Sequence, residues 1–275
     1  MSVVCQICPH HCNLSPGQTG ICKARKNIDG AIVCINYGKI TAIALDPIEK
    51  KPLRHFHPGS KVLSIGSFGC NMRCNFCQNH SISAAGEGLL NYREYSPAQL
   101  SQMAKELECK GNIGLAYTYN EPFVGYEFVF DCAKHIKDAK LKNVVVTNGL
   151  ICEETFKDIL PLIDAMNIDL KCFNHSYYKK LGGDFDTVKK TIENAVGSCH
   201  LEITNLIVPG ENDSVDEMEE LASWLASLNK KIPLHISRFF PNYKLNDRGA
   251  TPISTLESLY RVAKNHLDYV YLGNV

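Results

Sequence analysis

One stretch decides how this chain folds: residues 62–77, which read VLSIGSFGCNMRCNFC. The apolar run Val62–Phe68 has the length and the β-branched content of a buried strand. It continues directly into Cys70, Cys74 and Cys77, which are separated by three and then two residues. The stretch therefore predicts a strand that delivers a cysteine loop at its carboxyl end.

The spacing of these three cysteines indicates the kind of metal they could hold. Three thiolates on one short loop can bind three irons of a [4Fe-4S] cluster and leave the fourth iron open. An open coordination position distinguishes a reactive metal from a structural one. A ferredoxin would supply a fourth cysteine, and a zinc knuckle would show paired clips. We interpret the triplet as cluster ligands, with zinc or three structural cysteines as the alternatives.

The composition limits the other interpretations. The 275 residues include 29 Lys+Arg and 29 Asp+Glu, so no overall charge attracts nucleic acid or an anionic membrane. No apolar segment approaches the length of a membrane span, and no secretory signal opens the chain. Thirteen cysteines without such a signal favour metal ligation over disulfides. We therefore expect a cytoplasmic protein without a membrane or nucleic-acid partner.

From residue 61 onward, short apolar runs alternate with helical patterns, which is typical of a parallel α/β architecture. After the strand at 62–68, further strands are expected at 113–119, 144–147, 165–169, 201–208 and 234–239, with a final β-like run at 269–272. Helices are expected at 96–109, 124–140, 152–162, 185–197, 215–228 and 254–266. About six βα units are too few for a closed eight-unit barrel. We predict a partial, open (β/α)6 TIM-like barrel at 61–275, after a small cysteine-rich module at 1–60.

The cysteine triplet resembles the signature of the radical S-adenosylmethionine (radical SAM) superfamily. The resemblance implies that the open iron binds the amino and carboxylate groups of S-adenosylmethionine. It implies that one electron from the reduced cluster breaks the bond from sulfur to the 5′ carbon. The resulting 5′-deoxyadenosyl radical would then abstract a hydrogen atom from a substrate. An oxidoreductase-type enzyme served by a flavodoxin- or ferredoxin-type reductant is therefore expected.

The segment 119–122, Tyr-Asn-Glu-Pro, ends the second expected strand. The superfamily carries Gly-Gly-Glu-Pro there, and this segment contacts the amino group of the cofactor's methionine part. The resemblance thus implies that Asn120 and Glu121 bind the cofactor, although the two glycines are replaced. A polar turn that stops a strand is the plain alternative.

Two further strand ends carry candidate cofactor ligands. Thr147 and Asn148 end the third strand, where relatives line the cofactor pocket, although Asn-Gly is also a common turn. Asp169 and Lys171 end the fourth strand and share one face by β-alternation. Asp-Leu-Lys at this point resembles the activating enzymes of pyruvate formate-lyase, where it contacts S-adenosylmethionine. A solvated ion pair is the alternative.

The amino-terminal segment contains a second group of cysteines, Cys5, Cys8, Cys12 and Cys22. Four thiolates meet the ligand count of a closed site, which could hold zinc or a second iron–sulfur cluster. Ligand type does not choose between these metals, because thiolates suit both. Unligated thiols are the alternative, and the other six cysteines receive no role.

Across its length the chain resembles one branch near the pyruvate formate-lyase activating enzymes, the radical SAM component of the AmmeMemoRadiSam system. The segments that carry this resemblance are 5–12, 46–53, the triplet, 119–122 and 271–275. Activases usually carry a glycine-rich segment before the triplet, where this chain has His-Phe-His-Pro-Gly-Ser at 55–60. A glycyl-radical activase is therefore the alternative function, and a non-enzymatic metal or electron-transfer module is a third. The substrate, a protein among the possibilities, is not identified by sequence.

Overall fold

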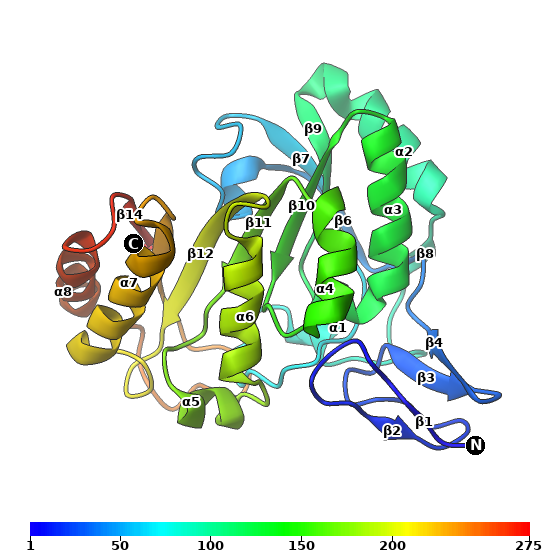
Figure 1. The fold of residues 1–275 in the computed structure, drawn as a ribbon, viewed down its shortest axis with the longest axis horizontal. Coiled ribbons are helices and arrows are strands. Elements are labelled where there is room, and N and C mark those ends of the chain that lie inside the picture. The colour runs from blue at the N-terminus through cyan, green and yellow to red at the C-terminus, as the bar shows by residue number, and fades with distance from the viewer.

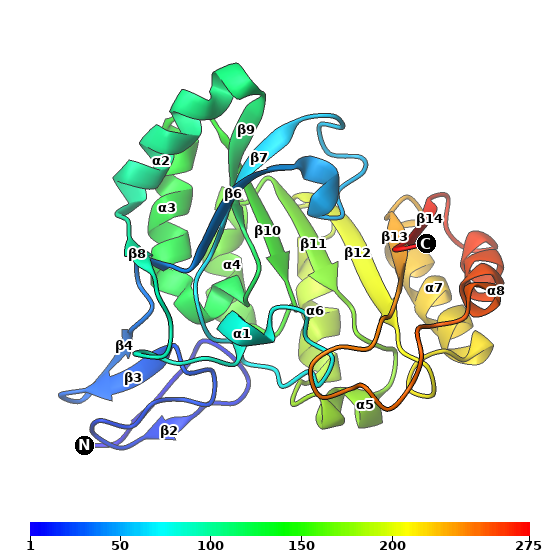
Figure 2. The ribbon, with the colours of Figure 1, turned by 180° about the vertical axis from the view of Figure 1, so that it is seen from behind.

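A single eight-stranded sheet, seen in Figures 1 and 2, organises the computed structural model, which describes residues 1–275. Its strands, in the order in which they lie side by side, are β14 (Val270–Gly273), β13 (Leu234–Arg238), β12 (His200–Ile207), β11 (Ala165–Asp169), β10 (Lys142–Thr147), β9 (Asn112–Tyr117), β7 (Lys61–Gly66) and β6 (Ala42–Pro47). All neighbours are parallel except β6, which is antiparallel to β7. Because β14 and β6 are the two edges and do not pair, the predicted partial, open barrel is confirmed.

Helices follow the strands and lie along one face of the sheet (Figures 1 and 2). They are α2 (Pro97–Glu106), α3 (Tyr126–Asp138), α4 (Glu153–Ile159), α6 (Phe185–Ala195), α7 (Val215–Asn229) and α8 (Ile253–Lys264), with single turns at α1 (His80–Ser83) and α5 (His175–Lys180). Short 3-10 turns are η1 (Ile48–Lys50), η2 (Leu107–Lys110), η3 (Pro122–Gly125) and η4 (Leu160–Leu162). Ser96 caps α2 in a reciprocal capping box with Gln99. No helix is both long and apolar enough to cross a membrane.

The amino-terminal segment forms small two-stranded sheets beside one end of the barrel (Figure 2). They pair β1 (Val3–Val4) with β2 (Asn13–Leu14), β3 (Arg25–Ile28) with β4 (Ala31–Cys34), and β5 (Lys39–Ile40) with β8 (Arg93–Glu94). The buried guanidinium of Arg25 binds both carboxylate oxygens of Glu127 on α3, which ties the segment to the barrel. Asp29 and Gly30 form the turn of the β3–β4 hairpin.

Strand β6 is an addition that the sequence pattern did not indicate. Residues 42–47 fall within the predicted amino-terminal module, yet they pair with β7 along its whole length. As an edge strand β6 is largely exposed, so it lacks the alternating burial that marks a strand in sequence. The chain therefore joins the barrel sheet well before residue 61.

The segment after β6 closes the amino-terminal end of the barrel. Ile48 and Leu53 form a small apolar cluster with inward side chains of four neighbouring strands. These are Val62, Ala116, Val144 and Ala165. Since this end of the interior is filled, free space is left at the carboxyl ends of the strands, where parallel βα folds place their sites.

Glu202 on β12 holds the same segment through hydrogen bonds to its backbone. Its carboxylate, which is fully buried, accepts hydrogen bonds from the backbone N–H groups of Arg54 (3.0 Å) and His55 (2.7 Å). It also bonds Nε2 of His200 at 2.9 Å and of His235 at 2.6 Å. Burial alone would raise the pKa of Glu202, but these four partners outweigh burial and lower it to about 2. His235, which sequence left without a role, is thus a structural partner.

We expect Glu202→Gln to destabilise the protein near neutral pH by about 3 kcal/mol, because the native carboxylate titrates well below the ordinary value near 4.3. A lowered carboxyl pKa gives stability that is present above the unfolded value and is lost as pH falls toward 2. Urea unfolding of the metal-free protein should therefore show a gap between wild type and variant that narrows below about pH 4.

The matched control is Glu219→Gln, which removes an exposed partner of His266. An exposed pair contributes roughly 0–1 kcal/mol, so this variant should unfold almost as wild type does. A gap for Glu202→Gln that stays constant from pH 7 to pH 3 would contradict the proposed role of its ionisation.

Candidate active site

The cysteine loop, residues 69–77, leaves β7 at the carboxyl end of the sheet and is held by distant parts of the chain. Four backbone hydrogen bonds of 2.7–3.1 Å connect it to other segments, three of which are far away in sequence. They run from Gly69 N–H to Ile82 O, from Cys70 N–H to Cys22 O, from Arg73 N–H to Leu181 O and from Lys244 N–H to Asn75 O. The position of the loop is therefore set by four segments outside the loop.

Gly69 is required for one of these contacts. Its φ of +91° lies in the region that favours glycine, and a Cβ there would lie 2.4 Å from the carbonyl oxygen of Cys22. The same Cβ would lie 3.0 Å from Cβ of Ala24. The amino-terminal segment can approach the cysteine loop this closely only because position 69 has no side chain.

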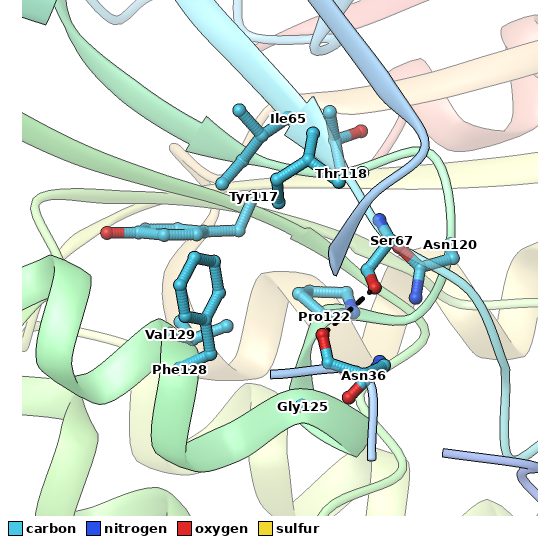
Figure 3. A pocket seen from close by; sticks show the side chains of 12 residues that line it. Asn36, Ile65, Ser67, Tyr117, Thr118, Asn120, Pro122, Gly125, Phe128 and Val129 are labelled. Atoms are coloured by element: carbon cyan, nitrogen blue, oxygen red, sulfur yellow. Dashed lines mark hydrogen bonds between the residues drawn. The ribbon is translucent and has the colours of Figure 1, made fainter. Parts of the chain in front are cut away.

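Two asparagine amides hold the link between β7 and the loop. Asn36 Nδ2 donates to Phe68 O at 2.9 Å. Asn120 accepts from Ser67 N–H at 2.8 Å and donates to Gly69 O at 3.0 Å. Figure 3 shows both asparagines beside Ser67, at a small cavity of about 30 Å³. Such a volume suits a water molecule or two rather than a substrate.

A cavity larger than the one beside Ser67 lies at the mouth of the barrel, by which we mean the carboxyl ends of its strands. It measures about 280 Å³, and the three loop cysteines line it. All six side chains that sequence predicts for cofactor binding line it as well: Asn120, Glu121, Thr147, Asn148, Asp169 and Lys171. The strand ends that sequence treated separately are thus brought to one place.

Glu121 is the most deeply buried charge-bearing group in this cavity. Its carboxylate accepts from Thr147 Oγ1 (2.8 Å) and from the N–H groups of Asn148 (2.8 Å) and Phe123 (3.0 Å). Burial raises the pKa of Glu121 to about 7, although these three donors act in the opposite direction. A buried carboxylate of this kind gains most from a cation, because a cation compensates its desolvation.

Asp169 and Lys171 form a close ion pair on one wall of the cavity, with Lys171 Nζ 2.7 Å from Asp169 Oδ2. Burial would lower the pKa of Lys171, but the neighbouring Asp169 carboxylate raises it above its ordinary value. Lys171 therefore stays charged. Leu170 between them is fully buried, as the predicted alternation requires.

Asn148 connects this cavity to the cysteine loop. Its side-chain Nδ2 donates to Asn71 Oδ1 at 2.9 Å and lies 3.7 Å from Cys70 Sγ. Burial raises the pKa of the Cys70 thiol well above its usual value, and it raises that of Cys74 to about 11. Since thiolates are the metal ligands, loading this loop with metal must release protons.

Several residues that line the cavity were not predicted from sequence. Thr204 on β12 and Ser237 on β13 lie on its far side. Inward alternation from Glu202 could have indicated Thr204. Tyr119 has φ of +70°, and its hydroxyl donates to Asp46 at 2.6 Å. That contact depends on β6, which sequence did not reveal.

The four amino-terminal cysteines also lie together. Cys5, Cys8, Cys12 and Cys22 line one enclosed cavity, and a Cβ at Gly20 would lie 3.8 Å from Sγ of both Cys12 and Cys22. This group lies directly behind the cysteine loop, because Cys22 O accepts from Cys70 N–H. No three His, Cys, Asp or Glu side chains, here or in the triplet, already surround a single-ion position.

The chain is similar to known proteins in sequence and in fold. An uncharacterized protein from Methanocaldococcus jannaschii is 42% identical over 283 residues, covering 99% of this chain and 81% of that protein. The pyruvate formate-lyase-activating enzyme of Clostridium pasteurianum is 24% identical over 215 residues, covering 73% of this chain and 89% of the enzyme. The structure of a radical SAM methyltransferase from Sphaerobacter thermophilus matches with a TM-score of 0.57 at 17% identity, over 79% and 67% of the two chains.

Fold and site together define an open α/β barrel with a thiol-lined mouth. The family model of the Radical SAM superfamily matches residues 64–225, which is more than half of the chain. The chain therefore belongs to the radical SAM superfamily, a family of enzymes that use a [4Fe-4S] cluster and S-adenosylmethionine.

We expect Gly69→Ala to reduce the iron bound after anaerobic reconstitution by more than half, because its Cβ would displace either the loop or Cys22. Iron per folded chain and the iron–sulfur absorbance measure this effect. Gly30→Ala is the matched control, since its φ of +86° carries the same backbone cost of about 1–2 kcal/mol but nothing lies within 4 Å of the added Cβ. Equal iron loss in both variants would contradict the role assigned to the close contact.

Proposed function

We propose that this protein is a radical SAM enzyme in which Cys70, Cys74 and Cys77 hold the [4Fe-4S] cluster. The observation that carries the proposal is the mouth cavity, where three thiols and six polar residues from three other strand ends meet. The residues fit the cofactors by their chemistry, since thiolates suit iron and the cavity offers both carboxylates and an ammonium group. When bound, the cofactors supply reductive cleavage of S-adenosylmethionine to a 5′-deoxyadenosyl radical.

The side chains of the cavity would orient the amino acid part of S-adenosylmethionine. Glu121 offers a buried carboxylate to an ammonium group, and Lys171 offers a charged donor to a carboxylate. Asn120 is engaged with Ser67 and Gly69, so its contribution in our proposal is to fix the loop and the adjoining Glu121. Thr147 and Asn148 hold Glu121 from the other side.

We expect Cys74→Ala to lose 5′-deoxyadenosine formation to background, because it removes a ligand of the cluster. The measurement is product release from S-adenosylmethionine under strong reduction, by the reconstituted protein. Cys132→Ala is the control, since this thiol is buried in the hydrophobic core away from the mouth. Persistent turnover in Cys74→Ala would refute the ligand assignment, and a well-loaded wild type without product would refute the function.

A glycyl-radical activase is the second candidate. It is supported by the similarity to the activating enzymes of pyruvate formate-lyase and of 4-hydroxyphenylacetate decarboxylase, at 24% and 23% identity. In this chain, residues 55–60 instead belong to the segment that Glu202 anchors at the opposite end of the barrel. An organic radical signal that appears in an added protein partner by electron paramagnetic resonance would favour this candidate.

We also propose that Cys5, Cys8, Cys12 and Cys22 hold a second metal site. Support comes from their convergence on one enclosed cavity, with three of the four side chains buried. Metal content should separate the two sites: a triplet variant should lose about four irons per chain, while the amino-terminal metal remains. Cys8→Ala should lose the amino-terminal metal and should keep the irons bound by the triplet. If Cys8→Ala changes neither zinc nor iron, the second site does not exist.

A further inference from the structure

The cysteine loop borders a second cavity, on its outer side. This cavity measures about 320 Å³, and Cys70, Cys74 and Cys77 line it as they line the mouth. Its other walls come from residues 21–23, 80–84 and 243–244, so Lys23 and Lys244 line it together with Arg73 of the loop. The triplet is therefore reached from two sides, of which only one is the mouth.

Three cations surround this outer opening, and none of them is neutralised. Lys23, Arg73 and Lys244 are all exposed, and no carboxylate lies within 4.0 Å of their charged atoms. We call these three residues the basic rim. The whole chain has as many acidic as basic residues, so the rim is a local concentration of positive charge.

The rim is fixed in place by the contacts that fix the cysteine loop. The backbone N–H groups of Arg73 and Lys244 donate to Leu181 O and Asn75 O. Lys23 Nζ donates to Ala84 O at 2.7 Å. The rings of His80 and Tyr243 stack at 4.3 Å and close the edge between α1 and the segment after β13. Figure 2 shows α1 and that segment at the same end of the sheet as the amino-terminal strands.

We propose that the basic rim is the docking surface for an acidic, flavodoxin-type electron-donor protein. The inference rests on the proposed function, because an enzyme of this class needs an external one-electron donor. A donor at the outer opening would lie next to the loop cysteines and would leave the mouth free for S-adenosylmethionine and substrate. Positive charges placed around such an opening attract an acidic partner and orient it.

The spacing of positive charge around the basic rim favours a protein over a small molecule as the electron donor that binds there. Three cations on separate segments suit a partner with a broad acidic face, because each exposed pair alone contributes little. The attraction must then weaken with salt, since charges separated by more than about 8–10 Å are screened at physiological ionic strength. Salt dependence is thus the mark of the proposed interface.

The test compares flavodoxin binding to three reconstituted proteins at low and at physiological salt. The variant Arg73→Glu/Lys244→Glu should raise the Kd for flavodoxin at low salt by about tenfold or more. The Kd of this variant should also depend less on salt than that of wild type. The control, Lys61→Glu/Lys110→Glu, makes the same change in net charge at exposed positions toward the other end of the barrel. It should bind within about twofold of wild type.

Two results would overturn the proposal. Equal weakening in both variants would show that net charge, not the basic rim, governs binding. Unchanged binding in Arg73→Glu/Lys244→Glu would show that the partner docks elsewhere. Should the charge-reversed variant fail to fold or load iron, Arg73→Gln/Lys244→Gln replaces it, with an expected weakening of about threefold.

A second readout separates this proposal from the proposed function. Product formation driven by a small chemical reductant should be the same in wild type and in Lys23→Gln/Lys244→Gln, which changes two rim side chains outside the cysteine loop. Flavodoxin-driven product formation should fall in this variant. If wild type makes no 5′-deoxyadenosine with any reductant, the function fails while the binding data still decide the docking surface. If product formation by the variant falls equally with both reductants, the rim supports the cysteine loop and is not a docking surface.

Discussion

The position of the cysteine loop depends on backbone hydrogen bonds from four segments outside the loop, three of them distant in sequence. Cys22, Ile82, Leu181 and Lys244 each make one of the four bonds to the loop. A loop of three metal ligands has little regular structure of its own, so its shape must be imposed by its surroundings. These surroundings are the amino-terminal segment, α1, the turn after α5 and the segment after β13. The barrel adds the strand ends that face the loop across the mouth.

Much of the fold and of the site could be predicted from sequence because both depend on local signals. Strand β7 with its cysteines and the Asp169–Lys171 alternation each depend on neighbouring residues. The missing features are those that tertiary contacts create. Edge strand β6 has no periodic burial, and the partners of Glu202 come from three separate parts of the chain. Sequence suggested that the Asn120 amide meets a ligand, but the structure shows this amide bonded to the link between β7 and the loop.

The two ends of the barrel use buried charge in opposite ways. At the amino-terminal end, Glu202 has four hydrogen-bond partners, and its carboxylate is stabilised as an anion. At the mouth, Glu121 has three donors and no histidine partner, and burial raises its pKa to about 7. The first is a finished structural anchor. The second is a carboxylate that burial destabilises as an anion, which agrees with the ammonium partner proposed for it.

The order of strands in the sheet has a consequence for how the protein matures. From β7 to β14, each new strand is added beside the strand that precedes it in the sheet, so the sheet can grow in step with synthesis. The cysteine loop emerges with the first of these strands, yet two of its four hydrogen bonds require residues 181 and 244. The nascent chain therefore carries unshielded thiols until most of it has been made. Protection of these thiols from oxidation until residue 244 has been added is therefore a requirement of this chain order.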